Sequence, residues 1–208
     1  GAASADDSIV VHCGGRTRSI VGAQTLIDFG FHNTVSLENG TMAWQFENLE
    51  LESGHGNTLP ALSGKQLAKL RQQARELATR FGVHTISALT TNSTRTRYVI
   101  DVREKADFEV GHVKGSRHIA GGHLLQNVDR YLVVRNADVV LIDTEGVRAP
   151  TVAVWLRRMG WPSVFTWQVD SQTDSLITGA EVFDSPREDR ELDPNDYPDR
   201  DLLMSQNR

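Results

Sequence analysis

The chain has 208 residues, of which 39% are hydrophobic and 24% charged, and it is long enough to bury a core. It contains no apolar run near the ~18 residues that a membrane span needs, and residues 1–20 show no signal-peptide pattern. We therefore expect a cytoplasmic protein with no membrane partner. The net charge is −5, but residues 181–208 hold nine acidic and four basic residues, which leaves 18 of each sign elsewhere. This balance argues against a nucleic-acid partner.

A single cysteine, Cys13, limits the chemistry that thiols can provide. It excludes a disulfide within the chain and a cysteine-based zinc site. Three histidines, His112, His118 and His123, lie close together, but their spacing fits no familiar metal site. We expect no metal and no cofactor.

The first predicted elements run in the order strand, loop, helix, strand, which is typical of an α/β fold. An apolar strand spans 9–11 and a second strand spans 34–37, before the turn signal Asn39-Gly40. Between them a helix starts near Ser19 and stops at Gly30. Its expected apolar face consists of Ile20, Ala23, Leu26 and Ile27.

The remaining elements continue the α/β pattern. Ser63 is a predicted cap for a helix that runs to about Arg80. Strands are predicted at 94–102 and 137–142, and a helix at 150–159. Residues 170–208 are acidic and are expected to be mostly extended. The four tryptophans are expected in the core or at domain contacts: Trp44, Trp155, Trp161 and Trp167.

The sequence also shows an internal repeat at an offset of 130 residues. Cys13 then aligns with Asp143, Arg18 with Arg148, and Gly30 with Gly160. Each copy reads as an apolar strand, a six-residue loop ending in arginine, a helix and a glycine. The first copy has few residues before its loop, so we expect an incomplete domain that needs a missing N-terminal half or another chain.

The loop after the first strand carries the residues most suited to chemistry. Cys13 follows a strand and precedes a helix, so backbone N–H groups and the positive end of the helix surround its thiol. Arg16 and Arg18 add positive charge, and such surroundings lower a thiol pKa and hold an anion. Gly14 and Gly15 permit the positive φ angles that we expect in such a cradle.

Two stretches of the chain resemble one known family. The loop "VVHCGGRTRS" is similar to the active-site loop of the rhodanese sulfurtransferases, and "LIDFGFHNTVSLENGTMAW" to the helix end and strand that follow it. The second copy opens with "YVIDVREKADFEVGHVKGSRHI", which resembles the start of a rhodanese domain. Within that motif, Asp101 and Arg103 are expected to hold the fold.

The resemblance implies an α/β fold of rhodanese-like domains, each with a central parallel sheet flanked by helices. Residues 1–56 would be the C-terminal half of a first domain, and 57–83 a linker with a helix. Residues 84–169 would form a second, inactive domain, and 170–208 an acidic tail.

The resemblance also implies sulfur transfer. Cys13 would take sulfur from a small anionic donor such as thiosulfate, as a persulfide, and pass it to a thiol or cyanide acceptor. The substrate-binding loop would comprise Gly14, Gly15, Arg16, Thr17, Arg18 and Ser19. Four residues separate Cys13 from Arg18, whereas phosphatases that share this fold have one more.

The second copy has Asp143 at the position of the nucleophile, and a carboxylate cannot form a persulfide. We expect this degenerate site to be inactive and Asp143 to pair with Arg148 across the loop. Two alternatives to a sulfurtransferase stay open. One is a non-catalytic rhodanese-like binding or regulatory module, and the other is a phosphatase-like enzyme.

Overall fold

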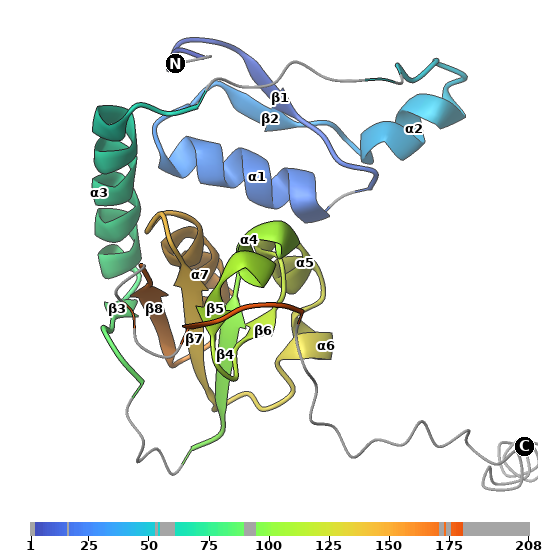
Figure 1. Cartoon of the computed structure of the whole chain (residues 1–208). Helices are drawn as coiled ribbons and strands as arrows, with labels where there is room; N and C mark the ends of the chain where they lie inside the picture. Colours follow the sequence, from blue (N-terminus) through green and yellow to red (C-terminus); the bar gives the residue numbers. More distant parts are fainter. Residues whose placement is uncertain are drawn as a thin grey trace, which may run out of the picture.

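The computed structural model describes residues 3–15, 17–52, 54, 61–89, 95–170, 173 and 176–180. Within these residues the chain forms two parts (Figure 1). We call residues 3–52 the N-terminal lobe and residues 61–180 the main domain. The predicted tail beyond residue 180 lies outside the described residues.

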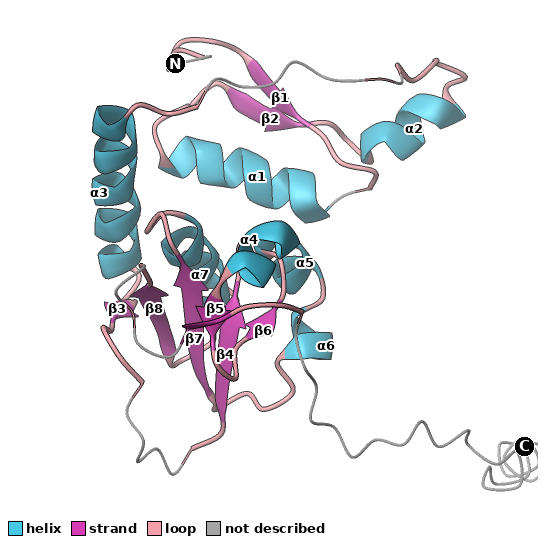
Figure 2. Ribbon diagram, in the orientation of Figure 1, coloured by secondary structure: helices cyan, strands magenta, loops and turns pink. Residues whose placement is uncertain are grey.

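The main domain is built on a five-stranded parallel sheet in the order β3-β8-β7-β4-β6. Its strands are β3 (His84–Thr85), β4 (Arg97–Asp101), β6 (Arg117–His118), β7 (Asp138–Asp143) and β8 (Val164–Gln168). Its helices are α3 (Gly64–Arg80), α4 (Lys105–Val110), α5 (Gly121–Gln126), α6 (Val128–Tyr131) and α7 (Arg148–Arg158). Two further strands, β5 (His112–Val113) and β9 (Leu176–Ile177), pair antiparallel. The chain therefore has the predicted α/β fold, with helices flanking a parallel sheet (Figure 2).

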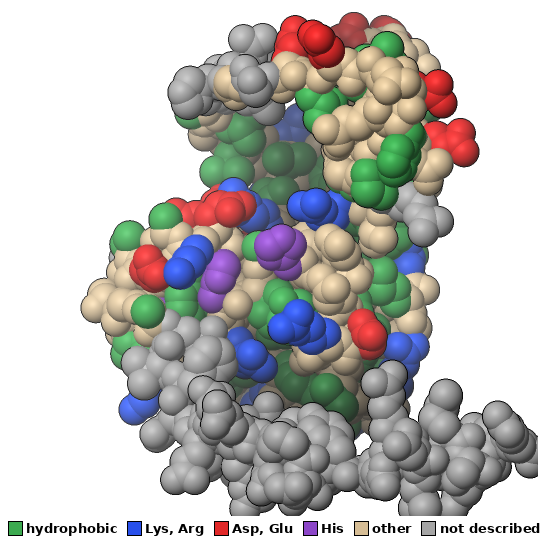
Figure 3. Space-filling model, turned by 90° about the vertical axis from the view of Figure 1, so that its right-hand side faces the viewer, with side chains coloured by type: hydrophobic (Ala, Val, Ile, Leu, Met, Phe, Trp, Pro, Cys, Tyr) green, Lys and Arg blue, Asp and Glu red, His purple; other side chains and the backbone are tan. Residues whose placement is uncertain are grey.

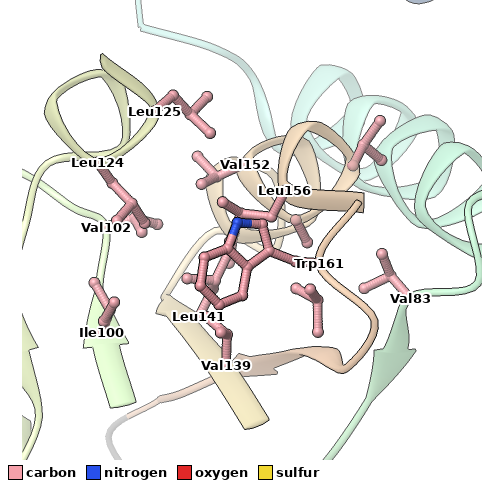
Figure 4. Close-up of a cluster of buried hydrophobic side chains, with 14 of the residues drawn as sticks. Val83, Ile100, Val102, Leu124, Leu125, Val139, Leu141, Val152, Leu156 and Trp161 are labelled. Atoms are coloured by element: carbon pink, nitrogen blue, oxygen red, sulfur yellow. The ribbon is translucent and has the colours of Figure 1, made fainter. Parts of the chain in front are cut away.

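The central strand β7 is apolar because both faces of the sheet are covered. Val139 and Leu141 face the larger hydrophobic cluster, which α3, α5 and α7 complete, whereas Val140 and Ile142 face a smaller cluster with Trp167. Successive side chains of a strand point to opposite faces, which explains this division. Figure 4 shows the larger cluster around the indole ring of Trp161.

Local signals set the ends of the helices that cover the sheet. The Ser63 side chain accepts a hydrogen bond from the backbone N–H of Gln66, and the Gln66 side chain accepts one from the backbone N–H of Ser63. The predicted cap is therefore a full capping box. Helix α7 starts at Arg148, two residues before the predicted start, and contains Pro150 in its first turn. Beyond the predicted tail boundary, β9 pairs with β5, so this short piece of residues 170–208 belongs to the domain.

The N-terminal lobe consists of β1 (Ile9–Val11), α1 (Thr17–Asp28), β2 (Thr34–Ser36) and α2 (Gly40–Phe46), with β1 and β2 paired in parallel. Helix α1 ends before Gly30, whose φ of 97° favours glycine. The predicted apolar face of α1 is only partly right. Ala23 is buried, whereas Ile20 is 53% exposed. The Ile20 side chain therefore lies on the solvent-facing side of α1.

The two parts share several backbone details at the offset of 130 residues. Ile9 pairs with Thr34 in the lobe, and Val139 pairs with Val164 in the main domain, so both loops begin from the same parallel pairing. Gly160 has a φ of 82°, close to that of Gly30. In the main domain β7 has a further neighbour, β4, whereas β1 pairs only with β2 among the described residues.

Hydrophobic side chains are exposed on the N-terminal lobe, which stands above the main domain (Figure 3). They include Val10 and Val35 on its strands, and Met42, Trp44 and Phe46 on α2. The expectation of a core or contact position is therefore wrong for Trp44, which is 42% exposed because α2 projects away from the main domain. None of the helices in the described part of the chain is long and apolar enough to cross a membrane.

Candidate active site

Cys13 lies between the end of β1 and the first turn of α1, and its side chain is partly exposed. Its Sγ accepts a hydrogen bond from the backbone N–H of Gly15 at 3.4 Å and lies 3.5 Å from Ser19 Oγ. The neutral thiol donates to this hydroxyl, whereas a thiolate would accept a hydrogen bond from it. Ser19 is buried in the first turn of α1, so the helix fixes its position beside the sulfur.

A second hydroxyl supports Ser19 from the neighbouring strand. Ser36 Oγ donates to Ser19 Oγ at 3.0 Å, and the register of the strands places Ser36 opposite Val11. A hydroxyl that accepts one hydrogen bond becomes a better donor in the next. Sequence reasoning missed Ser36, although the convergence of parallel strand ends at one edge was a usable signal.

These contacts lower the pKa of the Cys13 thiol from 9.0 to about 7. The Ser19 hydroxyl contributes most, the backbone N–H groups of Gly15 and Ser19 and the charge of Arg18 contribute further, and burial opposes them. At a pKa of about 7, about half of the thiol is ionised at neutral pH. The thiolate is the nucleophilic form of cysteine, so the site provides a nucleophile under ordinary conditions.

Gly40 packs closely against the backbone of the Cys13 loop. From the sequence alone, this residue was identified only as part of a turn. Its φ is 60°, and a Cβ at this position would lie 2.0 Å from the carbonyl oxygen of Cys13 and 2.8 Å from that of Gly15. The next residue, Thr41, donates its backbone N–H to the same Cys13 oxygen at 2.9 Å. Only glycine fits between these carbonyl groups, so the start of α2 sets the path of the loop.

The other predicted loop residues occupy different positions. Gly14 and Thr17 are exposed, and neither Gly14 nor Gly15 has a positive φ, so the expectation of left-handed glycines in this loop is wrong. The backbone turns instead through the contacts at Gly40. Arg18 is exposed and extends along α5, where a Cβ on Gly122 would lie 3.9 Å from its Cδ. Arg16 lies outside the described residues.

The second loop contains Asp143 in the position that corresponds to Cys13. Its carboxylate is fully buried and accepts backbone N–H groups from Gly146 at 2.9 Å, Val147 at 2.8 Å and Ala149 at 2.9 Å. Burial raises the pKa of this carboxyl group, and the three N–H groups act against that shift. The carboxylate thus occupies the position at which these three N–H groups of its own loop could otherwise bind an anion.

The predicted ion pair between Asp143 and Arg148 is wrong. Arg148 Nη1 lies 3.3 Å from Glu104 Oε1, at the surface. The short Asp143 side chain points into the loop, where backbone N–H groups satisfy it, while Arg148 begins α7 and extends outward.

Asp101 and Arg103 form a buried ion pair with a shortest distance of 2.6 Å. Arg103 Nη2 also donates to the carbonyl oxygen of Gly111 at 2.7 Å, which ties the end of β4 to the end of α4. These contacts agree with the expected scaffold role.

The histidines are also structural in their contacts. His112 stacks on Phe108 with ring centroids 3.7 Å apart, and His118 Nε2 lies 2.9 Å from the carbonyl oxygen of Arg103. His123 is exposed on α5. Among the described residues, no group of three or more histidine, cysteine or acidic side chains is arranged to hold a metal ion.

The sequence and the fold of the chain are similar to those of known proteins. The family model for the rhodanese-like domain matches residues 83–167. The solved structure of a thiosulfate sulfurtransferase from Pseudomonas aeruginosa is 37% identical, has a TM-score of 0.76, and covers 85% of this chain. The chain spans 35% of the length of that protein.

Two structures from Escherichia coli are more distant. A rhodanese with anions is 20% identical with a TM-score of 0.37, over 40% of this chain and 100% of its own. A 3-mercaptopyruvate sulfotransferase is 19% identical with a TM-score of 0.35, over 79% of this chain and 66% of its own. A search of curated proteins found no match. Residues 83–167 are a rhodanese-like domain, and the central parallel sheet of the chain has the rhodanese fold.

Proposed function

We propose that the chain transfers sulfane sulfur through a persulfide on Cys13. The observation that carries this proposal is the position of Cys13 Sγ between the Gly15 N–H and the Ser19 hydroxyl, which lowers its pKa to about 7. The similarity to a thiosulfate sulfurtransferase supports thiosulfate as the donor. The four-residue spacing between Cys13 and Arg18 favours this chemistry over the phosphatase-like alternative.

In the first step, the Cys13 thiolate attacks the outer sulfur of thiosulfate. A bond forms between the two sulfur atoms, the bond within thiosulfate breaks, and sulfite leaves with the electron pair. The product is a cysteine persulfide anion. The backbone N–H groups of the loop and the Ser19 hydroxyl stabilise its charge, and the positive charge of Arg18 adds to this effect.

In the second step, a thiophilic acceptor attacks the outer sulfur of the persulfide. Cyanide would leave as thiocyanate, and a thiolate would leave as a persulfide, while Cys13 returns as the thiolate. Cys13 is the sole cysteine of this sequence, so the sulfur would pass to an external acceptor or to another segment of a longer protein. The loop needs no cofactor or metal for either step.

We also propose that the N-terminal lobe is half of a second rhodanese domain. The shared strand register and glycine conformation at the offset of 130 residues support this relationship. By analogy with β4 beside β7, the edge of β1 that pairs with no described strand would receive a strand from a missing N-terminal half or from another chain. The exposed Val10 and Val35 would be covered on the face of the sheet, as Val140 and Phe165 are in the main domain.

The main domain itself would be inactive in sulfur transfer. Asp143 cannot form a persulfide, and its carboxylate occupies the N–H groups that an anionic sulfur would need. The alternative is that the whole chain has a non-catalytic role. The following test distinguishes this alternative from catalysis.

The test is the intact mass of the chain after incubation with thiosulfate, with and without a reductant. We expect a gain of about 32 Da, one sulfur atom, that the reductant removes. Cys13→Ser should show no gain, whereas Asp143→Asn should gain the same mass as the wild type. Absence of the gain both in this chain and in a longer chain that supplies the missing N-terminal half would contradict the proposal and favour a non-catalytic module.

A further inference from the structure

The N-terminal lobe has almost no hydrophobic core of its own. In the described part of residues 3–52, Ala23 is the one buried hydrophobic side chain. Val21 and Phe29, which extend from α1 and its end, pack instead against the larger cluster of the main domain. Helix α1 therefore obtains its hydrophobic contacts from the part of the chain that follows it.

The C-terminal half of α1 is held by specific polar contacts. Arg158 on α7 forms a bidentate ion pair with Asp28, with N–O distances of 2.6 and 3.0 Å. These side chains are only 23% and 12% exposed, so water screens the pair less than it screens a surface pair. The guanidinium of Arg158 also lies over the rings of Phe81 and Trp155, 4.7 and 4.9 Å from their centroids.

Two further features lie toward the Cys13 loop. Trp155 Nε1 donates to Thr25 Oγ1 at 2.9 Å in the middle of α1. At the start of α1, the Arg18 side chain and Gly122 of α5 line the same cavity. This cavity of about 260 Å³ separates the helices here and is bounded by Arg18, Val21, Leu125 and Trp155. The main domain thus contacts α1 at Val21, Thr25 and Asp28, and the cavity lies beside the first turn.

The paired residues have a common relationship in the sequence. Thr25 and Trp155 are 130 residues apart, and so are Asp28 and Arg158. This is the offset that also relates the two loops. Both contacts therefore join equivalent positions of the two copies. These contacts fix one helix relative to the other.

We propose that the main domain acts as a positioning platform for the Cys13 loop, and that Asp28, Arg158 and Trp155 are positioning residues which hold α1. Ser19, whose hydroxyl and backbone N–H both act on the Cys13 thiol, belongs to the first turn of α1. A helix that is fixed by these contacts keeps the two Ser19 donors at the sulfur. The filled loop at Asp143 agrees with this role, because its carboxylate joins the end of β7 to the start of α7.

The test compares Asp28→Asn, Arg158→Gln and the double variant in the full chain. Hydrogen exchange of the α1 amides and the pH midpoint of Cys13 alkylation are measured. Each single variant should speed α1 exchange by about fivefold or more and move the midpoint toward 9.0. The double variant should change little beyond Arg158→Gln, because Arg158→Gln already removes the ion pair that Asp28→Asn breaks.

Lys105→Gln is the matched control, because it breaks an ion pair with Glu109 whose side chains are 75% and 40% exposed. It should leave both measurements unchanged. Trp155→Phe keeps an aromatic ring beneath Arg158 but removes the hydrogen bond to Thr25, so it should give a smaller change in the same direction even if an Arg158 variant unfolds.

Unchanged α1 exchange and an unchanged midpoint in Asp28→Asn and Trp155→Phe would overturn the positioning role, and so would additive effects in the double variant. The role matters for catalysis only through the proposed function of Cys13. Because exchange and alkylation need no sulfur donor, failure of persulfide formation in the wild type would be distinguishable from failure of this proposal.

Discussion

Replacing Ser19 with alanine tests the origin of the acidic thiol. The Ser19 hydroxyl, 3.5 Å from Cys13 Sγ, is the largest of the contributions that lower the pKa from 9.0 to about 7. A thiol at the lower value is about half ionised at pH 7, and one at the upper value about 1%. Gly15, Arg18 and the Ser19 backbone remain in the variant. We therefore expect Ser19→Ala to lower the thiolate fraction at pH 7 by about fivefold or more.

The assay is the rate of iodoacetamide alkylation between about pH 5 and 10, followed by intact mass. Cys13 is the sole cysteine, so the signal needs no deconvolution. The rate should rise through the pKa, and the midpoint in Ser19→Ala should move to higher pH. Ser36→Ala should move it less, because Ser36 acts through Ser19. An unchanged midpoint in Ser19→Ala, with an unchanged melting temperature, would refute the reasoning.

Three further predictions concern the framework of the two loops. Gly40→Ala would place a Cβ 2.0 Å from a carbonyl oxygen at a φ of 60°, so we expect a loss of about 2–4 kcal/mol in urea unfolding and slower alkylation at pH 7. Asp143→Ala would leave three N–H groups without their acceptor and should cost about 2–5 kcal/mol. Asp143→Asn retains one acceptor oxygen and should cost less; equal losses would contradict this account. Asp101→Asn breaks a buried ion pair with Arg103 and should lower stability by about 3–5 kcal/mol, measured in the same way, whereas a loss below about 1 kcal/mol would show that the pair is dispensable.

Signals within single segments made much of the fold predictable. Apolar runs marked the strands, and Ser63 and Gly30 marked helix ends through local chemistry that depends on few neighbours. The position of Cys13 between a strand and a helix was predictable for the same reason. Its acidic thiol followed from the general electrostatics of such a loop.

Contacts between distant segments were harder to predict. Gly40 and Ser36 reach the Cys13 loop from beyond α1, so their roles depend on how the chain returns to it. The exposure of Ile20 depends on which side of α1 meets the main domain, and helical periodicity cannot identify that side in a lobe without its own core. Asp143 was singled out from the sequence, but its partners are backbone N–H groups, which nearly every residue offers and no sequence pattern marks.

The loops at Cys13 and Asp143 have similar backbones, and the side chain at this one position determines what the backbone N–H groups bind. Asp143 and Cys13 both follow a parallel strand and precede a helix, and both face N–H groups from the loop. A carboxylate is short, has two acceptor oxygens and satisfies three of these donors itself. A sulfur atom is a weaker acceptor, and the Gly15 N–H lies 3.4 Å from Cys13 Sγ, compared with 2.8 to 2.9 Å for the donors to Asp143. Aspartate therefore closes its loop and strengthens the junction of β7 with α7, whereas cysteine leaves donors available for the charge that a sulfur substrate would bring.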